Sequence, residues 1–192
     1  MLNTKKRVLI APLDWGLGHA TRCILIIREF LNIGTEVIIA ANGKTESLLK
    51  QEFPNLQFVK LRGYEVSYAR KNSFLKICLQ IPKIISVIIY EHQWLKRIIK
   101  DFQISMAVSD NRYGLWNKKI TSIFITHQIR LKLPSLLSFF EPLTYFINLL
   151  FINKYNFCWI PDFEKGVNSR QIRGQRGQKN KNSPGGRKKR RI

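Results

Sequence analysis

A histidine follows a glycine-framed turn near the amino end of the chain, and its type and position suggest chemistry. The stretch VLIAPLDWGLGHATR, residues 8–22, places Gly16 and Gly18 before His19. Glycine lets the backbone adopt positive φ or approach a ligand closely, and imidazole accepts protons near neutral pH. Free amides at the start of a helix bind anions. The stretch therefore predicts a proton acceptor beside a site for a phosphate or carboxylate.

Two charged side chains frame this histidine. Asp14, five residues earlier, is either an alternative base or the group that orients His19. Arg22 follows His19 by one helical turn, so it lies on the same helix face and can reach an acceptor phosphate. Thr21 stands where the dinucleotide-binding fingerprint needs a small residue, and no Gly-Lys-Ser/Thr follows the glycines, which argues against both phosphate-binding motifs. A plain tight turn is the alternative interpretation.

Apolar runs, glycines and prolines predict the elements that position these residues. Strands are expected at 8–11, 36–41, 56–61, 105–109, 122–126 and 157–160, and helices at 19–30, 44–52 and 74–100, the last broken or kinked at Pro82. The alternating order predicts a Rossmann-like parallel sheet with right-handed crossovers, flanked by helices. Residues 63–73 are expected to form a long loop that shapes a cleft at the carboxyl edge of this sheet.

Polar clusters follow two of the later predicted strands. Asp110, Asn111 and Arg112 come after one, and His127 and Gln128 come after the next. The carboxyl ends of parallel strands are where α/β proteins bind ligands, so these five residues are candidate substrate-binding residues. The alternative is structural: Asp110 or Asn111 caps a helix, and His127 is a half-buried side chain with ordinary partners.

Several blocks of sequence together resemble a known enzyme family. The block APLDWGLGHATRCILIIREFLNIGTEVIIAA is followed in order by QEFPNLQFVKLRGY, SDNRYGLWN, FITHQIRLKLP and CWIPDFE, and together these span residues 8–164. They resemble the amino-terminal, acceptor-side half of two-domain GT-B glycosyltransferases. The resemblance is to the bacterial family 28 N-acetylglucosaminyltransferases of peptidoglycan and lipopolysaccharide synthesis. Residues after Glu164 do not match.

This resemblance implies a nucleotide-sugar glycosyltransferase. The enzyme would transfer a hexose or N-acetylhexosamine, from a donor expected to be UDP-linked, to a lipid-linked or cell-envelope glycan acceptor. His19 would be the catalytic base, with Asp14 as the alternative, and Gly16, Gly18 and Arg22 would line the cleft. The donor is a substrate, so no cofactor is expected. Helix dipoles and basic side chains would stabilise the leaving diphosphate without a bound metal.

Length and charge divide the chain into two parts. Residues 1–164 suffice for one Rossmann-like domain, whereas a complete two-domain transferase needs about twice the chain. Residues 165–192 hold eleven Lys or Arg and no acidic residue, which is about half of the net charge of +21. Such a segment cannot bury a core and is expected to be disordered. We therefore expect an enzyme truncated near Lys165 and inactive alone, its second half lost by frameshift or encoded separately.

The charge also suggests other partners. The tail resembles a basic arm that neutralises nucleic-acid phosphates, so nucleic-acid binding is the alternative function, although residues 1–164 contain no recognisable module for it. Residues 74–100 interleave apolar residues with five Lys or Arg and predict either a helix that contacts an anionic membrane without spanning it or an ordinary core helix. Three cysteines without C-x-x-C spacing and no recognisable export signal favour the cytoplasm, at the inner face of the membrane.

Overall fold

The strands of the protein form one parallel sheet. The computed structural model describes residues 6–64, 73–126 and 141–161. The strands are β1 (Arg7–Pro12), β2 (Glu36–Ala41), β3 (Gln57–Lys60), β4 (Met106–Asp110), β5 (Thr121–Ile125) and β6 (Phe157–Trp159); the helices are α1 (Leu17–Asn32), α2 (Gly43–Glu52), α3 (Ser73–Phe102) and α4 (Glu141–Ile152). The strand order is β3-β2-β1-β4-β5-β6, with every neighbouring pair parallel. This is the order of a Rossmann-like sheet, which confirms the predicted fold class.

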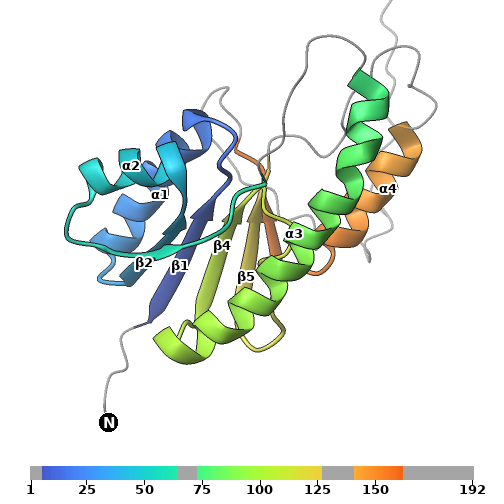
Figure 1. The fold of residues 1–192 in the computed structure, drawn as a ribbon. Coiled ribbons are helices and arrows are strands. Elements are labelled where there is room, and N and C mark those ends of the chain that lie inside the picture. Colours follow the sequence, from blue (N-terminus) through green and yellow to red (C-terminus); the bar gives the residue numbers. More distant parts are fainter. Residues whose placement is uncertain (1–5, 65–72, 127–140, 162–192) are drawn as a thin grey trace, which may run out of the picture.

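Helices lie on both faces of the sheet (Figure 1), and side chains that alternate along the strands pack against one helical layer or the other. Val8 and Ile10 of β1 belong to a core cluster that contains Ile27 of α1. Leu9, between them, faces the other way and packs in a cluster with Leu95 of α3. Each such buried aliphatic side chain stabilises the fold by about 1.5–3 kcal/mol. Because strands covered on both faces need apolar residues throughout, the continuous apolar run of β1 follows from its central place.

The predicted element boundaries hold to within a few residues, with one exception. α1 begins at Leu17, two residues before the predicted start, because Gly16 with φ 125° ends the turn there. The break predicted at Pro82 does not occur, since α3 is one helix of 30 residues with this proline inside it; a kink at Pro82, the predicted alternative, stays a prediction. An internal proline costs about 3 kcal/mol. Burial of Leu95 and other α3 side chains against the sheet offsets that cost.

Three sequence predictions fall outside the described part of the chain. They concern most of the 63–73 loop, the cluster with His127 and Gln128, and the basic segment 165–192 with its boundary near Glu164. Within the described residues, no helix is both long and apolar enough to cross a membrane.

Candidate functional site

His19 and Asp110 meet at the carboxyl edge of the sheet, between β1 and β4. These strands are neighbours, but the chain leaves β1 toward β2 and reaches β4 only after α3. Ligands of open α/β sheets bind at such a switch point, in the crevice outside the carboxyl ends of the strands. His19 lies in the first turn of α1, and Asp110 is the last residue of β4. The topology thus joins two candidate residues that are 91 positions apart in sequence.

The carboxylate of Asp110 contacts both His19 and Arg22. Its Oδ2 lies 3.0 Å from Nδ1 of His19, and its Oδ1 accepts a 3.0 Å hydrogen bond from Nη1 of Arg22. The Asp110 side chain is fully buried, whereas the His19 and Arg22 side chains each keep 14% of their surface exposed. The Asp110 carboxylate thus contacts both side chains from a position that solvent does not reach. His19 and Arg22 are the members of the group that solvent reaches.

This arrangement selects one tautomer of the imidazole. An ionised carboxylate only accepts hydrogen bonds, so Nδ1 of His19 carries the proton that it donates to Asp110. In the neutral ring, Nε2 is then the atom that can accept a proton. The Arg22 guanidinium compensates the negative charge of the buried Asp110 carboxylate, which would otherwise be costly to bury. The geometry is that of a general base held by a carboxylate.

The two carboxylates near His19 have different partners. Oδ2 of Asp110 contacts Nδ1 of His19. The Asp14 carboxylate instead accepts the backbone N–H of Tyr64 at 3.3 Å and lies 3.5 Å from Nη2 of Arg112. Asp14 also lies against Gly63, where a Cβ atom would fall 2.1 Å from its Oδ2. Asp14 therefore links the loops after β1 and β3.

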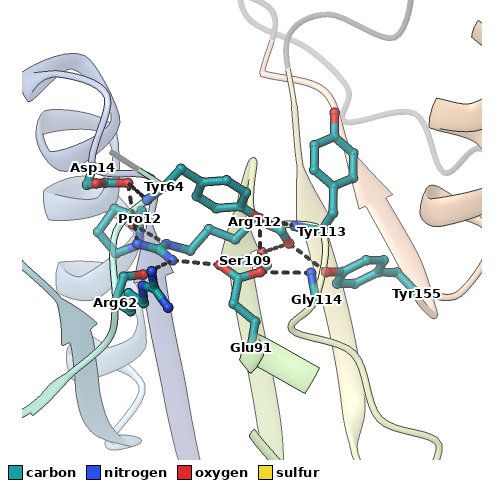
Figure 2. Close-up of polar contacts among 10 residues, drawn as sticks. All are labelled: Pro12, Asp14, Arg62, Tyr64, Glu91, Ser109, Arg112, Tyr113, Gly114 and Tyr155. Carbon is teal, nitrogen blue, oxygen red and sulfur yellow. Dashed lines mark hydrogen bonds and ion pairs between the residues drawn. The ribbon is translucent and has the colours of Figure 1, made fainter. Parts of the chain in front are cut away.

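Arg112, a predicted substrate-binding residue, lies in the interior and joins several loops (Figure 2). Its side chain is fully buried. Nη1 donates to Oε1 of Glu91 at 2.6 Å and to the carbonyl of Arg62 at 3.1 Å, and Nε donates to the carbonyl of Pro12 at 3.0 Å. One guanidinium thus ties together the segments after β1, β3 and β4, and attaches them to α3.

Glu91 of α3 is the counter-charge of Arg112, and sequence reasoning missed it. Its Oε2 accepts hydrogen bonds from the Tyr64 hydroxyl at 3.0 Å and from the backbone N–H of Gly114 at 2.9 Å. Burial raises the pKa of Glu91, while Arg112 and the two hydrogen-bond donors favour the charged form and limit that rise. The Tyr155 hydroxyl completes the network by donating to the Arg112 carbonyl at 2.6 Å. We call Glu91, Arg112, Tyr64 and Tyr155 the buried hub.

The start of α1 offers backbone N–H groups beside His19. The first four amides of a helix have no partner within the helix. Gly16 occupies the N-cap position, and within the described residues no side chain caps the helix there. The first turn also carries no acidic residue. Free amides and the positive end of the helix dipole favour an anionic group at this point.

The other predicted site residues have different positions. Gly16 has the expected positive φ, but Gly18 lies inside α1, with open space around its Cβ position. Asn111 directly follows Asp110 and adopts a left-handed conformation with φ 57°, which asparagine tolerates better than most residues. His127 and Gln128 lie outside the described residues. Within the part of the chain that the structure describes, no cluster of His, Cys, Asp or Glu is arranged to hold a metal ion.

Gly114 is where the hub approaches the backbone most closely. A Cβ atom there would lie 2.3 Å from the carbonyl oxygen of Ile88 and 2.5 Å from Cβ of Glu91. We expect Gly114→Ala to lower the free energy of unfolding by about 1–3 kcal/mol, because overpacking displaces α3. Urea denaturation measures this. Gly18→Ala is the control: it has open space in a helix and should gain up to about 1 kcal/mol. Equal changes in the free energy of unfolding in Gly114→Ala and Gly18→Ala would contradict the close packing of Gly114 against α3.

Comparisons with known proteins give a fold-level match only. No family model matches the chain. No curated protein matches it in sequence. Among solved structures, MurG from Acinetobacter baumannii is similar, with a TM-score of 0.48 and 12% sequence identity. The match covers 88% of this chain and 44% of that one, so the protein spans less than half of the MurG chain.

Proposed function

We propose that this domain is the acceptor-binding part of a nucleotide-sugar glycosyltransferase. The observation that carries the proposal is the 3.0 Å contact between Nδ1 of His19 and buried Asp110 at the switch point of the sheet. A base at this place, beside an uncapped helix start, suits an acceptor that bears a hydroxyl and an anionic group. The sequence blocks that resemble acceptor-side GT-B domains support the same activity.

The proposed reaction transfers a hexose or N-acetylhexosamine to a glycan or lipid-linked acceptor. Nε2 of His19 takes the proton of the acceptor hydroxyl while that oxygen forms a bond to the anomeric carbon of the donor. The bond from this carbon to the nucleoside diphosphate breaks, and the diphosphate leaves with the electron pair. The α1 amides and Arg22 hold an anionic group of the acceptor. A donor-binding half, in the same polypeptide or in a separate one, is part of the proposal.

A transfer assay tests this function. The full chain is incubated with labelled UDP-N-acetylglucosamine or UDP-hexoses and a bacterial lipid extract, alone and fused to the half of MurG that the structural match does not cover. We expect label to enter the extract with the fusion protein and negligible transfer with the chain alone. Failure of every donor with a folded fusion protein would contradict the proposal. Transfer by the chain alone would contradict the need for a second half.

We also propose that the acceptor domain works at a membrane surface. Ile81, Ile85 and Ile89 recur at four-residue intervals on α3, and 46–54% of each is exposed. Further along α3, a cavity of about 440 Å³ is lined by Lys96 and three more lysines. An exposed apolar stripe followed by basic residues favours peripheral binding to anionic lipid.

Vesicle co-sedimentation measures this contact. We expect Ile85→Glu together with Ile89→Glu to lower binding to phosphatidylglycerol vesicles by at least about tenfold, since each isoleucine contributes about 1.5–3 kcal/mol when buried. The control is Ile33→Glu, which changes an isoleucine 72% exposed at the end of α1. Equal losses in both variants would mean that added negative charge, rather than the α3 stripe, sets the binding.

A further inference from the structure

An exposed tryptophan stands on the same loop as the proposed base. Trp15 follows Asp14 and precedes the N-cap of α1, and 41% of its surface is exposed. Leu17, the first residue of α1, is 50% exposed. Neither residue is a member of the core clusters of the described residues.

The Trp15 ring rests on a rigid support. It makes an edge-to-face contact with Tyr64, with the ring centroids 6.0 Å apart and the ring planes at 80°. Tyr64 is only 3% exposed, and its hydroxyl donates to Glu91 in the buried hub. The Tyr64 backbone N–H donates to Asp14, the residue before Trp15. The Trp15 ring and the side chain of the preceding residue thus both contact Tyr64 of the hub, which limits the side-chain freedom that Trp15 would lose on binding.

Chain geometry keeps this ring close to the base. Trp15 and His19 are four residues apart, which limits their Cα separation to about 14 Å even in a fully extended chain. The first turn of α1 shortens that distance further. The indole and the imidazole therefore belong to one short segment at the start of α1.

We propose that Trp15 is the platform on which a pyranose ring of the acceptor stacks. An aromatic face offers a flat apolar surface to the C–H groups of a sugar, while the sugar hydroxyls remain available to His19 and Arg22. The exposed apolar surface on this loop comes from one indole and one leucine among polar residues, which suits a sugar face better than a long alkyl chain. The inference rests on the proposed function, for which it names a specificity-determining residue.

Sugar binding by the full chain tests the platform without any need for transfer. Saturation-transfer NMR with the disaccharide chitobiose at millimolar concentration measures contact with the pyranose C–H groups. We expect at least about a fivefold loss of signal in Trp15→Ala and retention of most of it in Trp15→Phe, which keeps an aromatic face. Leu25→Ala, at an exposed residue elsewhere on α1, is the matched control and should bind as the unmodified chain does. Full signal in Trp15→Ala would overturn the inference.

A kinetic arm separates this inference from the proposed function. In the fusion protein, Trp15→Ala should raise the acceptor KM about tenfold and leave kcat within about threefold, because the ring binds the acceptor and takes no part in proton transfer. A fall in kcat at unchanged KM would contradict the platform. If neither the chain nor the fusion protein transfers sugar but chitobiose binding still depends on Trp15, the proposed function fails and the sugar platform stands.

Discussion

Replacing His19 by alanine is expected to lower kcat for glycosyl transfer by about 10²–10⁴-fold, the usual contribution of a positioned general base. The KM of the nucleotide sugar should stay within about threefold, because the base acts on the acceptor hydroxyl. Initial rates with the fusion protein and labelled donor measure both constants. Transfer by His19→Ala at more than about a tenth of the original rate would remove His19 from the role of base.

Asp110→Asn isolates the positioning of the imidazole. The amide keeps the size of the carboxylate but carries both a donor and an acceptor, so it no longer enforces the Nδ1–H tautomer. We expect a loss of kcat close to that of His19→Ala, and no further loss when both changes are combined, because the two residues act as a unit. Additive losses would show that Asp110 acts independently of His19.

Truncating the buried hub is expected to have the largest effect on stability. Glu91→Ala leaves the buried Arg112 guanidinium with only the carboxylate of Asp14, 3.5 Å from its Nη2, as an ion-pair partner. Breaking a buried pair costs about 3–5 kcal/mol. Urea denaturation followed by circular dichroism measures the free energy of unfolding. The matched control is Glu36→Ala, which removes the partner of Arg7 from a pair whose side chains are 35% and 40% exposed and should cost at most about 1 kcal/mol. Equal losses of unfolding free energy in Glu91→Ala and Glu36→Ala would contradict the claim that the buried pair stabilises the fold more than the exposed pair does.

The same glutamate gives stability a defined dependence on pH. Burial raises the pKa of Glu91 in the folded state, so the folded protein binds this proton more tightly than the unfolded chain does. The raised pKa therefore adds to the free energy of unfolding at pH values below the pKa of Glu91 in the unfolded chain. This contribution is lost as pH rises through the pKa of Glu91 in the folded state. Glu91→Gln removes this titration. The difference in unfolding free energy between the original chain and Glu91→Gln should fall with rising pH, and a rise would contradict the direction of the pKa shift.

Much of the fold could be predicted from local sequence signals. The run from Val8 to Ala11 is apolar throughout, as a strand covered on both faces requires. Gly16 marks the positive φ that starts α1. Asp110 was a candidate because it directly follows a predicted strand, and parallel strands end at one edge of the sheet. Its contact with His19 depends on β4 pairing with β1, which is a property of the strand order and has no local signal.

The buried hub could not be predicted for a related reason. Glu91 lies within an amphipathic helical pattern, where a glutamate is normally an exposed charge. Only the packing of α3 against the loop after β4 brings it to Arg112, 21 residues further along the chain. The break predicted at Pro82 does not occur, because the tertiary contacts of α3 outweigh the local breaker signal. Long-range packing thus decides both the burial of Glu91 and the continuity of α3 through Pro82.

The tautomer of His19 can be measured on the full chain, whether or not a second half is needed for activity. The sequence contains only three histidines, so long-range ¹H–¹⁵N correlation spectra of histidine-labelled protein resolve each ring, and His19→Ala assigns its signals. At a pH where the imidazoles are neutral, we predict the Nδ1–H form for His19 and loss of its preference in Asp110→Asn. An Nε2–H form in the unmodified chain would mean that Nε2 already holds a proton and cannot take one from an acceptor hydroxyl.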